Sequence, residues 1–415
     1  MRARLAELPK GRALLVALLV VVLAVLLFSG GSEEPAPSAG TPGPPAGAPG
    51  PGGAPAAGPA ARERPPAAAA APAEVMKLVE EMSIEDKLAQ LILVGFEGTD
   101  ADAPTLAQLR KRDLGGIVLT SDNYEDRGQL ERLTREAEAV AARADHLPPW
   151  IMAVQEGGEF SAFEDLPPSK APADIGSPKE GGREAADAAK ALTQAGVNGT
   201  LAPVLDVAPE SGGALGPRAY SDSAEDVVDY AVATVSAYEQ GEIFAAAKHF
   251  PGLGGASQPT EVGPANVGLS FEELELRDLK PFRAAVEAGV PGMLVGHGTY
   301  ASDDFVTPAS LSPSVLTDLL RDQLGFEGLA ISDDLTSPAV TATIPTPEAA
   351  IEAIGSGADM VYVGGAEGDQ EDAYLALLGG VRKGAVSPER IDEALVRVLS
   401  AKRELGLLDE KRRGG

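Results

Sequence analysis

Eight short apolar segments, separated by longer amphipathic stretches, restrict the fold of this sequence more than any other feature. The segments are Leu91–Val94, Gly116–Leu119, Ile151–Val154, Thr200–Val204, Phe244–Ala247, Gly292–Val295, Leu329–Ser332 and Met360–Val363. Helical periodicity marks the stretches between them, including Gln129–Ala144, Ala224–Glu239 and Leu274–Ala288. Apolar strands that alternate with helices indicate a parallel sheet buried on both faces.

Eight such units predict an α/β fold of the (β/α)8 barrel type in a single folded domain. A doubly wound open sheet is the alternative. That fold would place a glycine-rich phosphate loop after the first strand, and no such loop follows Leu91–Val94.

The N-terminus has the pattern of a membrane-targeting segment. A continuously apolar run from Ala13 to Phe28 follows the basic residues Arg2, Arg4, Lys10 and Arg12. No charged residue occurs between Arg12 and Glu33. A helix of 20 uncharged residues rises about 30 Å, which is roughly the thickness of a bilayer core. We therefore expect residues 1–32 to form a signal anchor that holds the protein in the cell membrane by a single pass, with the folded domain outside the cytoplasm. A cleaved signal peptide, giving a secreted protein, is the alternative.

The segment that follows is composed almost entirely of Pro, Ala and Gly. It cannot bury enough apolar surface to fold, so residues 33–73 are predicted to be a disordered, semi-extended linker. The folded domain is predicted over residues 74–410. A capping-box pattern at Ser83–Asp86 is expected to begin one of its first helices.

Composition excludes several classes of site and partner. The chain has 415 residues, a net charge of −28, no cysteine and three histidines. An acidic surface repels phosphate backbones, so nucleic acid is not an expected partner. Without cysteines there can be no disulfide, thiolate metal site or cysteine nucleophile. We expect no metal and no cofactor, and take a monomer as the expected state.

Polar residues follow the predicted strands at the ends where barrel enzymes carry their active sites. Glu156, within Gln155–Gly158, comes after the third strand, and Asp206 comes after the fourth. Lys248 and His249 follow the fifth, His297 follows the sixth, and Asp333 and Asp334 follow the seventh. Because these strand ends meet at one rim of a barrel, the residues are expected to converge there.

Several of these segments resemble glycoside hydrolase family 3, and in particular its single-domain bacterial β-N-acetylhexosaminidases. The most specific motifs are Lys248-His249-Phe250-Pro251-Gly252 and Ile331-Ser332-Asp333-Asp334-Leu335. The segments Ser83–Gly98, Leu201–Val207, Thr307–Ser312 and Ile391–Leu407 are also similar to the family, so the resemblance covers nearly the whole predicted domain.

The resemblance implies a retaining glycosidase acting on an N-acetylglucosamine-containing glycan derived from the cell wall. Asp333 matches the family's nucleophile, which would form a covalent glycosyl-enzyme. Lys248, His249 and Arg218 match residues that bind sugar hydroxyls. Glu156 and His297, on the same rim, are further candidates for substrate binding.

The sequence departs from the family pattern at three places. Val154 stands where an aspartate usually precedes Gln-Glu-Gly-Gly, and Glu159 stands where an arginine follows it. Leu253 replaces the histidine of a Gly-His-Gly loop. Most importantly, Pro259-Thr260-Glu261 occupies the position of the Asp-Ser-His triplet that supplies the family's general acid/base.

Two interpretations follow from the missing triplet. In the first, Glu261 is the general acid/base, because a carboxyl performs this role in most glycosidases when its pKa is raised by burial or by a neighbouring carboxylate. In the second, the barrel has lost catalysis and binds a glycan or a protein in the cell envelope.

Overall fold

The structure is a computed structural model that describes residues 71–100, 104–209, 213–301 and 305–409. The predicted signal anchor and all but the last three residues of the predicted linker lie outside the described residues. Within the described ranges, no helix is long and apolar enough to cross a membrane. The first described helix, α2 (Ala73–Glu81), begins beside the predicted start of the folded domain.

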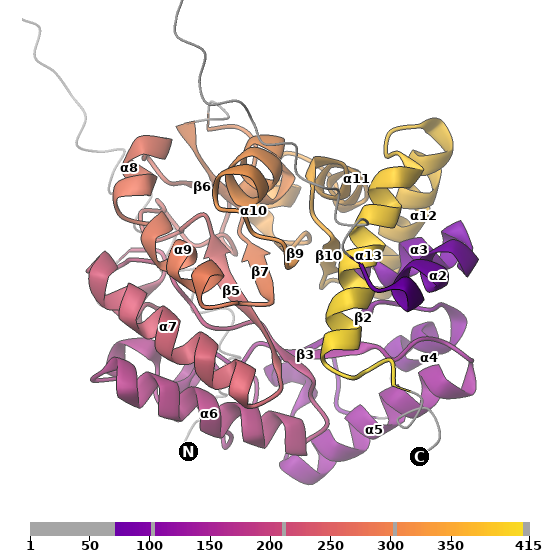
Figure 1. Cartoon of the computed structure of the whole chain (residues 1–415), viewed down its shortest axis with the longest axis horizontal. Coiled ribbons are helices and arrows are strands. Elements are labelled where there is room, and N and C mark those ends of the chain that lie inside the picture. Colours follow the sequence, from indigo (N-terminus) through magenta and orange to yellow (C-terminus); the bar gives the residue numbers. More distant parts are fainter. Residues whose placement is uncertain (1–70, 101–103, 210–212, 302–304, 410–415) are drawn as a thin grey trace, which may run out of the picture. The chain divides into compact units, whose positions relative to one another are not determined.

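Eight parallel strands close into a barrel, which confirms the predicted fold class (Figure 1). Their order around the barrel is β1-β10-β9-β7-β5-β4-β3-β2, so the chain winds round once and the last strand pairs with the first. The barrel strands are β1 (Ile92–Val94), β2 (Gly116–Leu119), β3 (Trp150–Ala153), β4 (Gly199–Thr200), β5 (Phe244–Phe250), β7 (Gly292–Val295), β9 (Leu329–Asp334) and β10 (Met360–Val363). A separate two-stranded sheet pairs β6 (Ala265–Asn266) with β8 (Gly298–Thr299).

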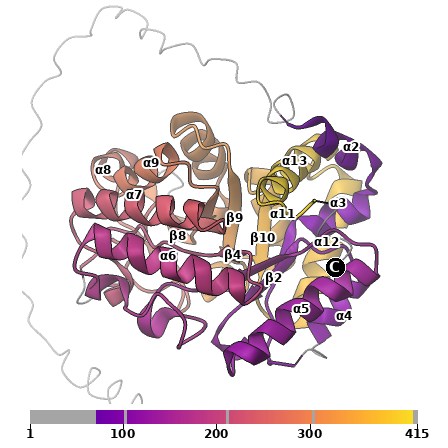
Figure 2. The ribbon, with the colours of Figure 1, turned by 60° about the horizontal axis from the view of Figure 1, so that its bottom comes forward.

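Helices surround the barrel, and α6 and α7 lie side by side on one flank of it (Figures 1 and 2). The remaining α-helices are α3 (Ile84–Gln90), α4 (Pro104–Lys111), α5 (Arg127–Arg143), α6 (Pro178–Gln194), α7 (Ala224–Gln240), α8 (Phe271–Leu276), α9 (Leu279–Glu287), α10 (Pro338–Thr341), α11 (Thr346–Ser356), α12 (Glu367–Lys383) and α13 (Pro388–Glu404). The predicted capping position is confirmed, because the Ser83 side chain accepts a hydrogen bond from the Asp86 amide at the start of α3.

The predicted strands differ from the observed ones mainly at their C-terminal ends. The fourth strand is shorter than expected, since β4 ends at Thr200 and only an isolated bridge pairs Val204 with Lys248. Pro203 has no N–H for a ladder hydrogen bond, which explains the early end. The fifth and seventh strands are longer, so that Lys248 and His249 lie within β5 and both aspartates lie within β9.

The prediction of one continuous helix over Leu274–Ala288 is wrong, because the structure contains two helices there, α8 and α9. At the break, Asp278 turns inward and is almost fully buried. Its carboxylate receives two hydrogen bonds from Arg277, at 2.9 and 3.0 Å. Arg277 has a φ of −135°, outside the helical range, and Pro281 explains the break because its ring would clash with the Arg277 carbonyl in a continuous helix.

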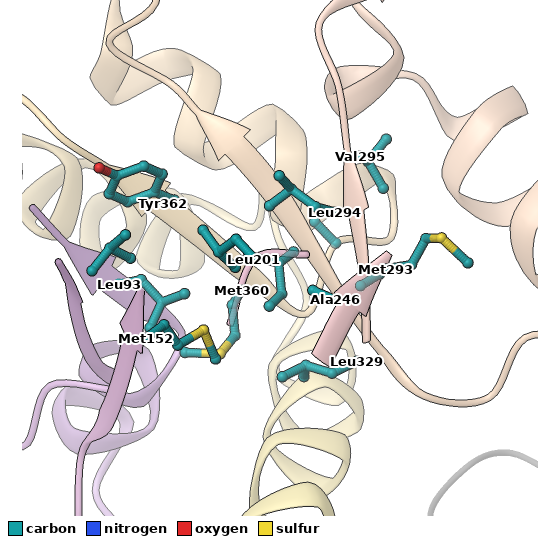
Figure 3. Packing of buried hydrophobic residues seen from close by; sticks show 14 of the residues in the cluster. Leu93, Met152, Leu201, Ala246, Met293, Leu294, Val295, Leu329, Met360 and Tyr362 are labelled. Carbon is teal, nitrogen blue, oxygen red and sulfur yellow. The ribbon is translucent and has the colours of Figure 1, made fainter. Parts of the chain in front are cut away.

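Apolar side chains from several strands fill the inside of the barrel. Leu93, Met152 and Met360 gather there from β1, β3 and β10 (Figure 3). The strands are buried along their length, as expected for a parallel sheet covered by helices. This packed interior leaves the C-terminal ends of the strands as the surface on which a site can form.

A buried lysine beneath the barrel predicts a pH-dependent stability. Lys402 is fully buried, and its ammonium donates to Gln90 Oε1 at 2.7 Å. Burial lowers the pKa of Lys402 from its ordinary 10.5 to about 7, although Asp113 partly opposes this. Between these pH values the unfolded chain holds a proton that the folded protein lacks. The free energy of unfolding should therefore rise with pH across this window, by at most about 1.4 kcal/mol per unit.

Replacing Lys402 with methionine should remove this rise. Urea unfolding at pH 7, 8 and 9 would measure it, with the exposed Lys179→Met as the matched control that keeps the native slope. If Lys402→Met and the native protein show parallel pH profiles, the buried lysine does not titrate in this range.

Candidate active site

The polar residues that follow the predicted strands lie together at the C-terminal end of the barrel, as expected. Glu156 follows β3, Lys248 and His249 end β5, and Asp333 is the penultimate residue of β9. Arg218 is carried by a short helix, η5 (Gly216–Arg218), in the long connection after β4. The structure thereby brings together residues from three strands and one loop.

Glu156 is the centre of a buried charge cluster. Its side chain is 2% exposed, and Lys248 Nζ lies 2.5 Å from its Oε1. Arg218 binds the same carboxylate through two hydrogen bonds of 2.7 Å. Burial would raise the pKa of Glu156, but the two cations outweigh it and hold that pKa far below its usual value. A carboxylate engaged in this way orients Lys248 and Arg218 and has little capacity left for a sugar.

His249 is held by a residue whose role the sequence did not reveal. Asp206, at 0% exposure, accepts a hydrogen bond from His249 Nδ1 at 2.7 Å and another from the His249 amide at 3.2 Å. The other carboxylate oxygen of Asp206 accepts from the Leu253 amide at 2.6 Å. Nε2 of His249 therefore points away from Asp206 and lies 3.2 Å from Arg218. The one available signal was that Asp206 follows the fourth predicted strand, which neighbours β5.

Asp333 has the properties that a nucleophilic carboxylate needs. It is half-buried, and its Oδ1 accepts a hydrogen bond of 2.9 Å from the next amide. Burial opposes ionisation, but His297, His249 and Lys248 outweigh it and lower the pKa of Asp333 below its usual 3.8. The carboxylate is thus ionised at neutral pH.

His297 is fully buried and both of its ring nitrogens are occupied by the protein. Nε2 donates to the backbone carbonyl of Asp334 at 2.8 Å, and Nδ1 lies 2.7 Å from the hydroxyl of Ser310. This geometry fixes the end of β9 on which Asp333 lies. Sugar binding by His297 stays a prediction, and the contacts that the structure gives it are positioning ones.

Asp334 and Asp333 have different surroundings although they are adjacent. Oδ1 of Asp334 accepts hydrogen bonds from the amide and hydroxyl of Thr336, at 2.9 and 2.8 Å, and from the Gly364 amide at 2.8 Å. Burial raises the pKa of Asp334 despite these bonds. Asp334 therefore ties β9 to the loop after β10, and Asp333 is the one available for chemistry.

Glu261 lies on the loop after β5 and is the most exposed of the candidate residues, with 66% of its side chain accessible. Its Oε1 is 3.8 Å from Arg218 Nη1, which links it to the charge cluster. The preceding residue anchors the loop, because the Thr260 carbonyl accepts hydrogen bonds from Ser337 Oγ at 2.7 Å and from the Ala339 amide at 3.0 Å. These partners follow β9 directly, so the loop is fastened to the segment that comes after Asp333.

The positions where the sequence departs from the family pattern have other roles here. Val154 packs half-buried against the hydrophobic core, and Glu159 is exposed. Leu253 is 4% exposed and contributes its backbone amide to the Asp206 anchor. The site therefore has the predicted cationic residues and the carboxylate of Asp333, without a carboxylate at position 154.

A (β/α)8 barrel with an ionised aspartate at a strand end, facing buried cations, is the architecture of a barrel hydrolase. The family model described as "Glycosyl hydrolase family 3 N terminal domain" matches residues 83–401. The chain belongs to this family.

Curated relatives agree with this assignment. The chain is 31% identical over 286 residues to a "Beta-hexosaminidase" of Nitrosomonas eutropha, covering 66% of this chain and 80% of the relative. It is also 31% identical over 286 residues to a "Beta-hexosaminidase" of Stenotrophomonas maltophilia, covering 66% and 83%.

Solved structures with the same fold include a glycoside hydrolase family 3 β-N-acetylglucosaminidase from Paenibacillus sp. The TM-score is 0.75 at 29% identity, covering 79% of this chain and 63% of that one, so this protein spans less than two thirds of it. A β-N-acetylhexosaminidase from Beutenbergia cavernae matches with a TM-score of 0.70 at 26% identity, covering 78% and 99%.

Proposed function

We propose that this protein is a retaining β-N-acetylhexosaminidase that releases N-acetylglucosamine from glycans derived from the cell wall. The observation that carries the proposal is the ionised, half-buried Asp333 beside Lys248 and His249. Membership of the family, and relatives named β-hexosaminidase, support the type of reaction and the sugar.

In the proposed reaction, a carboxylate oxygen of Asp333 attacks the anomeric carbon of the sugar. The bond to the leaving-group oxygen breaks as that oxygen takes a proton from Glu261, and a covalent glycosyl-enzyme forms. Glu261 then removes a proton from water, which attacks the same carbon and releases Asp333. Two displacements give overall retention of configuration.

The cations are proposed to bind the sugar while Glu156 orients them. An ammonium has three donors, and Lys248 uses one on Glu156, so it has donors left for hydroxyl groups. Arg218 and His249 would bind neighbouring hydroxyls. Contacts that strengthen as positive charge develops on the sugar ring lower the barrier.

Incubating the purified protein with an aryl N-acetyl-β-glucosaminide and a panel of other aryl glycosides tests the proposal. We expect turnover of the N-acetyl-β-glucosaminide above the level of an Asp333→Ala control. Absence of turnover on every substrate would overturn it. Binding of the glycan without any product would then favour the second interpretation, an envelope-binding module.

The role of Glu261 makes a narrower prediction. Glu261→Gln should lower kcat/KM by about 10²–10⁴ on substrates with poor leaving groups, which need protonation, and far less on activated aryl substrates. A leaving-group series measured on the variant and on the native protein would detect the difference.

The exposed Glu272→Gln, which carries the same substitution on α8, is the matched control and should have no effect on either substrate type. An equal loss on both substrate types in Glu261→Gln would exclude proton donation by this residue.

Residues 1–32 are proposed to anchor the protein in the cell membrane with the barrel outside the cytoplasm, on the basis of the sequence alone. Deleting these residues should move the protein from the membrane fraction to the soluble fraction. A mature protein whose N-terminus lies beyond residue 28 would instead support a cleaved signal peptide and a secreted enzyme.

A further inference from the structure

A cavity opens on the barrel rim, mainly at the ends of strands that carry none of the candidate catalytic residues. It measures about 510 Å³ and lies where β1, β2 and β10 end. Its lining includes Glu97, Thr120, Asp122, Asp334, Tyr362 and Glu367. We call it the β1–β10 pocket. It adjoins the candidate active site through Asp334, but Asp333 does not line it.

Buried amide side chains hold the walls of this pocket in place. Gln370, at 3% exposure, donates to the carbonyls of Gly95 and Gly364 at 2.6 and 2.8 Å and so joins the loops after β1 and β10. Asn123, fully buried, donates to the carbonyls of Phe96 and Gly98 at 2.9 and 3.0 Å. Walls fixed by such bonds make a pre-formed pocket, and its volume lies in the range of small-molecule sites.

The close packing of Asp334 against Gly364 also indicates that the walls of the pocket are fixed. A Cβ at this position would stand 2.1 Å from Asp334 Oδ2, so only glycine allows the loop after β10 to lie against Asp334. While Oδ1 of Asp334 accepts three hydrogen bonds, Oδ2 accepts none from the residues that the structure describes.

The chemistry of the lining is strongly biased towards a cation. Glu97, Asp122 and Glu367 line the pocket, and within the described ranges none of them has an ion-pair or hydrogen-bond partner. No lysine, arginine or histidine lines it. All three side chains are exposed, and their negative charges would attract a cation that enters the pocket.

Tyr362 gives an independent sign of a ligand. The residue is 8% exposed and lines the pocket, and its hydroxyl has no hydrogen-bond partner among the described residues. Figure 3 shows the ring at the end of β10, above the apolar interior of the barrel. The hydroxyl therefore remains available to bond to a polar group of a ligand that enters the pocket.

Two other ligand classes fit less well. In the part of the chain that the structure describes, no group of three or more histidine, cysteine, aspartate or glutamate side chains is placed to hold a metal ion. An anion would be repelled by the carboxylates. The N-terminus of α12 borders the pocket and would by itself favour an anion, but Asp369 already accepts a hydrogen bond from the Ala366 amide there, at 3.1 Å.

We propose that the β1–β10 pocket binds a hydroxylated primary ammonium, namely an amino sugar whose nitrogen is not acetylated. The ammonium lies among Glu97, Asp122 and Glu367, and sugar hydroxyls bond to Tyr362 and Thr120. This site is separate from the Asp333 site, and its occupancy does not depend on whether the protein hydrolyses glycosides.

Calorimetric titration of the purified protein with methyl β-glucosaminide, at a pH where its amine is protonated, tests the proposal. We expect saturable binding that weakens with added salt. Methyl N-acetyl-β-glucosaminide has the same hydroxyls but no charge. Because it should still bind at the Asp333 site, its affinity is compared before and after the pocket is altered.

Glu97→Gln/Asp122→Asn should weaken the amine about tenfold or more and leave the N-acetyl ligand unchanged. Tyr362→Phe should weaken the amine as well. The control Asp229→Asn/Glu287→Gln removes the same charge from exposed helix positions and should leave both ligands unaffected. Binding of the amine should persist in Asp333→Asn. Failure of the amine to bind, equal losses in the two double variants, or loss of the amine in Asp333→Asn would each overturn the proposal.

Discussion

Asp333→Asn is expected to lower kcat on an aryl N-acetyl-β-glucosaminide by at least about 10³-fold while leaving substrate binding measurable. The amide has nearly the shape of the carboxylate but cannot attack the anomeric carbon. The residues proposed to hold the sugar keep their own partners, since Lys248 stays on Glu156 and His249 stays on Asp206. Steady-state kinetics combined with calorimetric titration of N-acetylglucosamine separates the two effects.

The neighbouring Asp334→Asn provides a matched comparison. Its Oδ1 accepts all of the hydrogen bonds that the structure gives this side chain, and an amide oxygen can accept the same bonds. We therefore expect a loss of less than about tenfold, because that side chain does not take part in bond making. Similar losses in the two variants would contradict the assignment of Asp333 as the nucleophile.

The lowered pKa of Asp333 predicts part of the pH dependence of kcat/KM. Because Asp333 ionises below its usual 3.8, the nucleophile stays charged at every pH above about 4. An acid limb of kcat/KM between pH 5 and 7 would then have to come from another group.

Asp359→Asn should destabilise the fold by about 3–5 kcal/mol, because it removes the buried negative charge that three arginines share. Asp359 is fully buried before β10, and its carboxylate lies 2.6 Å from Arg321 and 3.1 Å from both Arg390 and Arg397. It also accepts a hydrogen bond from the Ala330 amide at 3.0 Å. One carboxylate thus joins two barrel strands to helix α13 and to the helix η8 (Ser314–Gln323).

Urea unfolding at pH 7 measures this loss, and Asp322→Asn is the control. Asp322 is exposed, so its replacement should change the free energy of unfolding by less than about 0.5 kcal/mol. Burial would raise the pKa of Asp359, but the three arginines lower it below 3.8, so its stabilising effect is present above that pH and is lost as the pH falls further. If Asp359→Asn and Asp322→Asn unfold at the same urea concentration, Asp359 does not stabilise the fold.

Much of the fold followed from sequence pattern. All eight predicted strands exist and form the predicted closed barrel. Fully apolar strands between amphipathic helices need a fold in which both faces of the sheet are buried, and few folds provide this. The early end of β4 and the divided helix have local causes in Pro203 and Pro281, which cannot donate a backbone hydrogen bond. The burial of Asp278 against the loop at Gly252 is decided by the tertiary structure.

The candidate site was predicted in part. Its residues were found because they follow strands that must end at one rim of the barrel. Asp333 was found in the same way, and the family resemblance gave it the role of candidate nucleophile. The sequence did not indicate that Glu156 is engaged by Lys248 and Arg218, or that both nitrogens of His297 are occupied by the protein. Those pairings depend on side-chain direction across neighbouring strands.

The sequence by itself determined the barrel, since the fold depends on the order and period of residues along the chain. Its resemblance to the family supplied Asp333 as the candidate nucleophile and showed Pro259-Thr260-Glu261 at the position of the Asp-Ser-His triplet. The tertiary structure alone decided which charges are paired and where a pocket opens. The β1–β10 pocket exists because closure of the barrel pairs Val94 with Val363 and so joins loops from opposite ends of the folded domain. Such a contact depends on strand register, which no local pattern records.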